Sequence, residues 1–157
     1  MSVEVGGPAP DFTLPGSDNT ETGRRDYSLA EYRGQVVVLV FYPGDNTPVC
    51  TRQLNAYTED ISSFTEAGAQ VLAVSPQSVA SHDEFSGKQG GFGFPLLADS
   101  DKAVGEAYGI LGPLGFYRRS AFVIDADGVV RYAHRAVAGL TFRSTKELVA
   151  AVEAASG

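Results

Sequence analysis

The strongest constraint on the fold is an uninterrupted apolar run at Val36–Tyr42. Its β-branched and aromatic residues predict a strand that is covered on both faces. Turn residues at 43–46 end the run, and apolar residues then recur at the spacing of a helix, at Leu54, Tyr57, Ile61 and Phe64. Gly68 closes this helix, and Val71–Val74 has the pattern of the next buried strand. The succession of strand, helix and strand predicts two parallel strands joined by a right-handed crossover.

Shorter elements follow in the second half of the chain. Ser81–Glu84 has the pattern of a capping box, which predicts that a helix begins at Ser81. Residues 94–97 indicate a short extended segment, and residues 101–108 a helix. The residues 109–117, which include three glycines and a proline, predict a loop.

A hairpin and a final helix complete the expected order. Residues 120–124 and 129–132 have the composition of strands, and they flank a turn at 125–128, which is a strong hairpin signal. A second capping box at Ser144–Glu147 predicts the start of the last helix.

The order of elements favours one architecture. It is β-α-β, an inserted helical stretch, a hairpin and a helix, which fits an α/β thioredoxin-like fold with a central mixed β-sheet flanked by helices. The chain has the length of one domain and shows neither repeats nor a linker. We therefore expect a single domain over residues 1–157.

Charge and hydropathy exclude several classes of protein. The formal net charge of −7 argues against a nucleic-acid-binding protein, which would normally present a basic surface. The longest apolar stretch, Val36–Tyr42, is too short to cross a bilayer, and the N-terminus lacks the pattern of a signal peptide. We expect a cytoplasmic protein with neither a membrane nor a nucleic acid as partner.

Cys50 is the only cysteine of the chain, so an internal disulfide and a cysteine-rich zinc site are both excluded. A Cys-x-x-Cys redox pair is excluded because the second position is Gln53. A lone cysteine is most often a small buried apolar residue. Its surroundings decide whether it is also reactive.

The position of Cys50 in the predicted helix favours reactivity. Thr47 is a good N-cap residue, and Pro48 after it is the preferred first helical residue. Cys50 is then the third residue of the helix, where the helix dipole and unpaired backbone N–H groups favour a thiolate. The junction also follows a parallel strand, where open sheets place their ligands. We therefore predict a reactive position for Cys50, not a core position.

Four segments together resemble the peroxiredoxin family. Residues 43–50 have its Pro-x-x-x-Thr-x-x-Cys spacing, and residues 8–14 are similar to its N-terminal segment. Ser81–Phe85, followed by residues 94–99, resembles the bacterioferritin comigratory protein (peroxiredoxin Q) branch. Arg119–Asp125 is similar to the strand that carries the family's active-site arginine. The strand–turn–helix context predicted around Cys50 is the one that the cysteine motif requires.

The resemblance implies a thiol-dependent peroxidase that reduces hydrogen peroxide and organic hydroperoxides. Cys50 would attack the peroxide and become a sulfenic acid. Thr47 and Arg119 would stabilise the developing negative charge, and Pro43 would shape and shield the pocket. Arg118 competes with Arg119, but alternation along a strand sends the two side chains to opposite faces, and the family pattern selects Arg119. No metal or organic cofactor is implied.

The sequence departs from its branch at one point. Many peroxiredoxin Q proteins carry a resolving cysteine five residues after the reactive one, where this chain has Asn55. The resemblance therefore implies a one-cysteine cycle whose reductant is an external thiol (a thioredoxin-like protein or a small thiol) or a cysteine of another subunit. A monomer and a homodimer both remain open, and Phe116 and Tyr117 could mark a contact surface.

Three other functions compete with this interpretation. A tyrosine-phosphatase-like loop needs Cys-x5-Arg, and Ala56 at the arginine position excludes it. A cysteine hydrolase would need His82 or His134 beside Cys50, although both histidines are more typical of structural or solvated residues. A non-catalytic sensor that passes oxidation of Cys50 to a partner protein is the remaining alternative.

Overall fold

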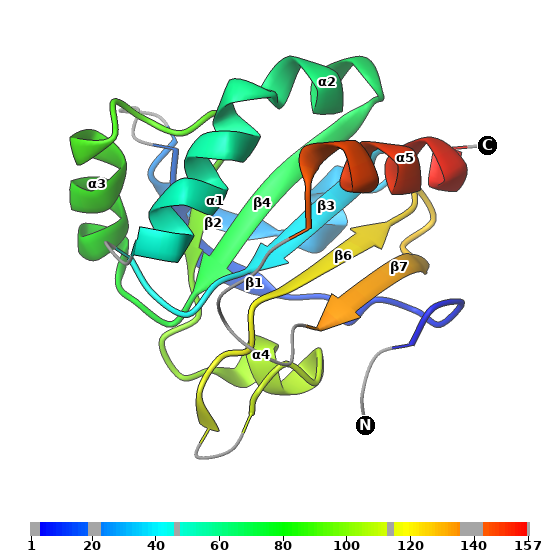
Figure 1. Cartoon of the computed structure of the whole chain (residues 1–157). Coiled ribbons are helices and arrows are strands. Elements are labelled where there is room, and N and C mark those ends of the chain that lie inside the picture. The colour runs from blue at the N-terminus through cyan, green and yellow to red at the C-terminus, as the bar shows by residue number, and fades with distance from the viewer. Residues whose placement is uncertain (1–3, 19–22, 46–47, 113–114, 136–142, 157) are drawn as a thin grey trace.

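A single mixed sheet organises the computed structural model, which describes residues 4–18, 23–45, 48–112, 115–135 and 143–156. Within these residues the strands lie in the order β2-β1-β5-β4-β3-β6-β7 (Figure 1). The strands are β1 (Thr13–Ser17), β2 (Arg25–Ser28), β3 (Val36–Phe41), β4 (Ala69–Ser75), β5 (Leu96–Ala98), β6 (Ser120–Ile124) and β7 (Val130–Arg135). The helices are the 3-10 helix η1 (Leu29–Tyr32), α1 (Pro48–Glu59), α2 (Ile61–Glu66), α3 (Val79–Lys88), α4 (Ala103–Ala107) and α5 (Thr145–Ser156).

The centre of the sheet confirms the predicted crossover. Strand β3 pairs in parallel with β4, and β4 pairs in parallel with β5. On its other side β3 pairs with β6 in the antiparallel sense, so the sheet is mixed, as expected. Every residue of β3 is buried, which agrees with a strand covered on both faces.

Helices cover the two faces of the sheet unequally. Helices α1, α2, α3 and α5 supply the residues that pack on one face, among them Leu54, Phe64, Phe85 and Leu148. The other face is covered by α4, η1 and the segment before β1. The helix-rich layer is visible above the sheet in Figure 1, with α4 apart from it. Cys50 belongs to the core under the helix-rich layer.

Two predicted helix boundaries were wrong. The helix expected to run through Phe64 is broken at Asp60, whose φ of −102° and ψ of 17° end α1 before α2 begins. The apolar spacing continues across this break, so the sequence pattern alone could not show it. Helix α3 begins at Val79, with Ser78 as its N-cap. Ser81 lies inside the helix, where its backbone N–H donates to Ser78 Oγ.

The hairpin of β1 and β2 was not predicted from the sequence. Strand β1 contains Pro15 and Gly16, two residues that weaken any strand pattern. The structure explains the glycine, because a Cβ atom on Gly16 would lie 2.8 Å from the Leu96 carbonyl oxygen of the neighbouring strand β5. A close approach between two backbones, which sequence periodicity does not record, therefore decides this position.

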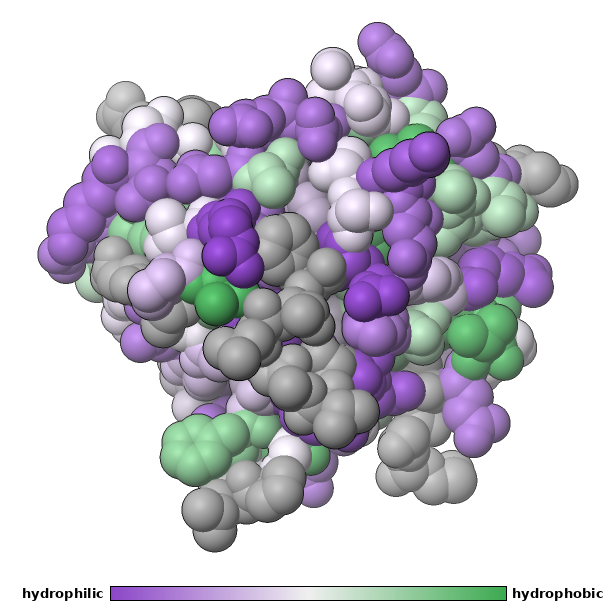
Figure 2. Space-filling model, viewed as in Figure 1, coloured by the Kyte–Doolittle hydropathy of each residue, from purple (hydrophilic) through white to green (hydrophobic). Residues whose placement is uncertain are grey.

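The outer surface is mostly polar. Hydrophilic residues occupy much of the face shown in Figure 2, with only small apolar areas between them. Phe116 is one of two large apolar side chains with high exposure among the described residues, at 66%. Tyr117 is 6% exposed and packs in the core, which favours packing within the protein over a contact surface for this residue. No helix in the described ranges is long and apolar enough to cross a membrane.

Candidate active site

Cys50 occupies the predicted place at the start of a helix. Helix α1 begins at Pro48, which makes Cys50 its third residue, and β3 ends a few residues before it. Pro43 lies exposed in the connection between β3 and α1. Thr47, the predicted N-cap and peroxide-binding hydroxyl, lies outside the described residues.

The Cys50 thiol lies in the first turn of α1 and is also buried. The Cys50 side chain has an exposed fraction of 0% and belongs to the apolar core under the helices. The prediction that Cys50 does not occupy a core position was therefore wrong. Cys50 lines neither of two large surface hollows, which have volumes of about 610 and 620 Å³.

A buried cation contacts the sulfur directly. Arg119 is the residue directly before β6 and is 3% exposed. Its Nη2 donates to Cys50 Sγ at 3.1 Å. A positive charge at this distance favours the ionised form of a thiol. Arg118 instead directs its Nη2 to the Arg135 carbonyl oxygen at 3.4 Å. The structure thus brings Arg119 to Cys50 and directs Arg118 to β7.

Gln53 holds this arginine from inside α1. Its Oε1 accepts a hydrogen bond from Arg119 Nη1, and its Nε2 lies 3.4 Å from the Tyr57 hydroxyl. That hydroxyl donates to the Arg143 carbonyl oxygen at 2.6 Å, just before α5. Burial raises the pKa of Tyr57 to about 12, so the hydroxyl keeps the proton it donates. The sequence showed Gln53 one turn after Cys50, but not that it meets a residue of β6.

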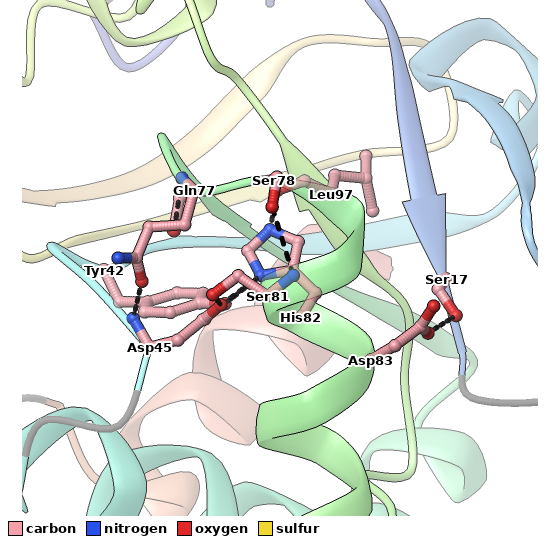
Figure 3. Close-up of polar contacts among 10 residues, drawn as sticks. Ser17, Tyr42, Asp45, Gln77, Ser78, Ser81, His82, Asp83 and Leu97 are labelled. Atoms are coloured by element: carbon pink, nitrogen blue, oxygen red, sulfur yellow. Dashed lines mark hydrogen bonds and ion pairs between the residues drawn. The ribbon is translucent and has the colours of Figure 1, made fainter.

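A second buried polar cluster joins Asp45, in the connection before α1, to His82 and Ser81 of α3 (Figure 3). His82 of α3 places Nδ1 2.8 Å from Asp45 Oδ2, and its Nε2 lies 2.9 Å from the Leu97 carbonyl oxygen. Ser81 and Tyr42 donate their hydroxyl protons to the same Asp45 carboxylate, each at 2.7 Å. Sequence reasoning had treated His82 only as a structural or solvated histidine.

The charge state of this cluster follows from its partners. Burial opposes ionisation of Asp45, but the hydrogen bonds from His82, Ser81 and Tyr42 outweigh it and hold the pKa of Asp45 below its usual range. A carboxylate and a carbonyl oxygen only accept hydrogen bonds, so both ring nitrogens of His82 must donate. The cluster therefore contains an imidazolium paired with a carboxylate.

The same geometry argues against a cysteine hydrolase. Both ring nitrogens of His82 are engaged, one with Asp45 and one with Leu97, so His82 is not available as the base for Cys50. His134 lies on β7, where burial lowers its pKa and nearby Arg143 lowers it further. No group of three or more His, Cys, Asp or Glu side chains that could hold a metal ion occurs among the residues whose positions are described.

Known proteins resemble this chain in sequence and in fold. The sequence profile of the AhpC/TSA family matches residues 5–133. The putative peroxiredoxin bcp of Coxiella burnetii is 38% identical over 137 residues, which are 83% of this chain and 87% of the relative. The solved structure of Xanthomonas campestris peroxiredoxin Q has a TM-score of 0.78 at 34% identity, covering 91% of this chain and 90% of that one. Mycobacterium tuberculosis AhpC reaches a TM-score of 0.88 at 21% identity over 98% and 93% of the chains, a likeness of fold alone.

Proposed function

The chain belongs to the AhpC/TSA family of peroxiredoxins and is a thiol-dependent peroxidase, and from this premise we propose that Cys50 is the residue that reduces the peroxide. Its fold is the thioredoxin-like fold expected from the order of its elements. The observation that carries the proposal is the contact between Arg119 Nη2 and Cys50 Sγ, 3.1 Å long, in the first turn of α1.

In the first step, one oxygen atom is transferred from the peroxide to the Cys50 thiolate. The Cys50 sulfur attacks the distal oxygen of the peroxide, an S–O bond forms and the O–O bond breaks. The sulfur is oxidised to a sulfenic acid. The other peroxide oxygen leaves with the electron pair and, once protonated, becomes water or an alcohol.

Arg119 acts on both charges in this step. Its guanidinium stabilises the thiolate before the reaction and lies close to the negative charge that develops on the oxygens during it. Gln53 supports this role because it fixes one end of the guanidinium while the other end faces the sulfur. As the family resemblance implies, the Thr47 hydroxyl is proposed to donate a hydrogen bond to the peroxide. Pro43 is proposed to shield the pocket.

The second half of the cycle needs a thiol from elsewhere. Since Cys50 is the only cysteine, its sulfenic acid is reduced by an external thiol, which forms a mixed disulfide with release of water. A second external thiol then attacks the mixed disulfide, which releases Cys50 as a thiol and leaves a disulfide between the two external thiols. A thioredoxin-like protein or a small thiol would serve, and we place the chain in the cytoplasm, where such thiols are kept reduced. It would act there as a monomer or a homodimer.

The test is peroxide turnover with a panel of thiol donors. The chain contains no tryptophan, so Cys50 oxidation is followed by rapid acid quenching and intact-protein mass, which records the gain of one oxygen. Wild-type protein should consume hydrogen peroxide and organic hydroperoxides, and Cys50→Ser should do neither. Oxidation of wild-type Cys50 no faster than that of a free thiol would refute the proposal.

The same experiment identifies the reductant. Each donor is added to the oxidised protein, and the return of Cys50 to its reduced mass is timed. If the thiol of a second copy completes the cycle, the partner thiol is that copy's own Cys50, so a disulfide-linked dimer should accumulate on non-reducing gels. Its absence during rapid turnover would leave the external donors as the source of electrons.

A further inference from the structure

We propose that the buried Asp45–His82 pair positions the connection between β3 and α1 for the reaction of Cys50, so that both residues are positioning residues of the peroxidase site. The inference rests on the proposed role of Cys50. Neither residue is proposed to touch the peroxide. Both act through Tyr42, whose hydroxyl donates to Asp45 and whose side chain lies in the same apolar core as Cys50.

Asp45 lies at the centre of an unusually well-connected piece of loop. It is 6% exposed and stands five residues before Cys50 in the chain. Its carboxylate accepts hydrogen bonds from His82, Ser81 and Tyr42, while its backbone N–H donates to the Gln77 side-chain oxygen. Connecting segments usually lie at the protein surface, whereas Asp45 is buried and is held by side chains of Tyr42, Gln77, Ser81 and His82.

His82 connects that loop to the sheet. Its ring is 1% exposed, and its two nitrogens join Asp45 on one side to the Leu97 carbonyl oxygen of β5 on the other. Because the imidazole is rigid, the two hydrogen bonds fix the distance between the loop and β5. Figure 3 shows the ring between the two partners, with the next residue, Asp83, directed away toward Ser17 of β1.

Tyr42 carries the effect to the cysteine. Its hydroxyl donates to Asp45, and its side chain belongs to the same apolar core as Cys50. Burial, followed by the charge of Asp45, raises the pKa of Tyr42 well above its usual value, and the proximity of Cys50 contributes in the same direction. A displacement of Asp45 would therefore disturb a side chain packed near the reacting sulfur.

The charges of the pair also suit a thiolate site. A lone buried carboxylate near Cys50 would disfavour the thiolate, because like charges raise the cost of ionisation. The imidazolium of His82 lies 2.8 Å from the Asp45 carboxylate and cancels most of its charge. The pair can thus hold the loop rigidly without opposing Arg119.

Two substitutions of the same histidine separate its two hydrogen bonds. The amide of His82→Asn takes the place of Nδ1 and can still donate to Asp45, whereas the longer amide of His82→Gln takes the place of Nε2 and reaches toward Leu97. We expect His82→Gln to lower the rate constant for Cys50 oxidation by about 10- to 100-fold, since small misplacements of reacting groups have effects of this size. Both variants lose the positive charge of His82, so the difference between them isolates the hydrogen bond to the loop. We expect His82→Asn to oxidise at least about 5-fold faster than His82→Gln, because it retains the donor to Asp45.

A purely structural histidine would give a different result. If His82 only fastened α3 to β5, His82→Gln would be the milder change, or both variants would react alike. Either result would overturn the proposal, as would wild-type rates in both. Asp83→Asn is the matched control on the same helix, and it should oxidise at the wild-type rate.

Ser81→Ala keeps the proposal testable if neither histidine variant folds. It removes one hydroxyl that donates to Asp45 and leaves the ion pair in place, so a decrease of about 3-fold is expected, and an unchanged rate would then count against the proposal. Far-ultraviolet circular dichroism at the assay temperature identifies the folded variants. A wild-type protein that does not react with peroxide would instead refute the role of Cys50 itself.

Discussion

Two buried polar clusters lie near Cys50, the proposed nucleophile, and they are built on opposite principles. On one side Arg119 contacts the thiol and a neutral amide, Gln53, so its positive charge is directed at the sulfur. On the other side Asp45 and His82 carry opposite charges 2.8 Å apart, which largely cancel. The first cluster therefore places a positive charge at the Cys50 sulfur, whereas the second carries almost no net charge.

The difference shows how a site can be both charged and rigid. A buried ion pair adds little net stability compared with apolar packing, but the loss of one partner leaves the other charge uncompensated. Such a pair is therefore a strict geometric constraint on the loop that holds Asp45. Arg119 gains from burial in another way, because its field at Cys50 is weakly screened there.

The largest expected effect is the loss of stability when the Asp45–His82 pair is broken. His82→Leu leaves the Asp45 carboxylate buried without its counter-charge and should lower the free energy of unfolding by about 3–5 kcal/mol. Asp83→Asn weakens a partly exposed pair with Arg24, keeps an oxygen that can accept from Ser17, and should cost about 0–1 kcal/mol. Urea denaturation near neutral pH measures both, and equal losses would contradict the assignment of a buried ion pair.

The next effect concerns rate. Arg119→Ala should slow Cys50 oxidation by about 100- to 1000-fold, because it removes the cation aimed at the developing charge. Arg118→Ala, which removes a neighbouring arginine directed toward β7, should leave the rate within about 3-fold of wild type. Quenched-flow oxidation of both variants gives the comparison. Similar rates for the two would show that a general positive field, not the contact with the sulfur, is what matters.

A smaller effect is expected at the support of the arginine. Gln53→Leu leaves Arg119 Nη1 without that buried acceptor, which should cost about 1–3 kcal/mol of stability. Oxidation should slow by about 10-fold because the guanidinium is less well oriented. Asn55→Ala, on the same helix, removes a hydrogen bond to Gln89 and serves as the control. A loss of stability without a loss of rate would show that Gln53 does not orient Arg119.

The smallest effect is the acid dependence of stability. The pKa of Asp45 is lowered on folding, so its contribution is complete above the unfolded value of about 3.9 and is lost as the pH falls through the folded value. The stability difference between wild type and Asp45→Asn should therefore shrink on acidification, by at most about 1.4 kcal/mol per pH unit. Denaturation curves between pH 6 and pH 3 measure this difference, and a constant difference would show that the pKa of Asp45 is not lowered on folding.

Local patterns predicted what local physics decides. The strand at Val36–Phe41 and the hairpin of β6 and β7 were recognised because burial and turn chemistry are recorded in neighbouring residues. The third helical position of Cys50 followed from Pro48 in the same way. The break at Asp60 was missed because the apolar spacing continues through it.

The contacts of the site were not predictable in this way. Arg119 reaches Cys50 and Gln53 across more than sixty residues of chain, and His82 meets Asp45 across 37. Side chains so far apart meet only because β3 lies between β4 and β6 in the sheet. A family resemblance pointed to Arg119, and the spacing of one helical turn placed Gln53 near Cys50. Nothing in the sequence pointed to the contact between Gln53 and Arg119 or to the Asp45–His82 pair.

The sequence by itself therefore determined the identity of the reactive atom and its place at the start of a helix, because a single cysteine and the residues just before it are local facts. Only the tertiary structure decided that this cysteine is also buried, that Gln53 holds the arginine facing it, and that Asp45 and His82 form a buried pair. The physical reason is that burial and charge pairing depend on how the strands are ordered, and that order is a property of the whole sheet.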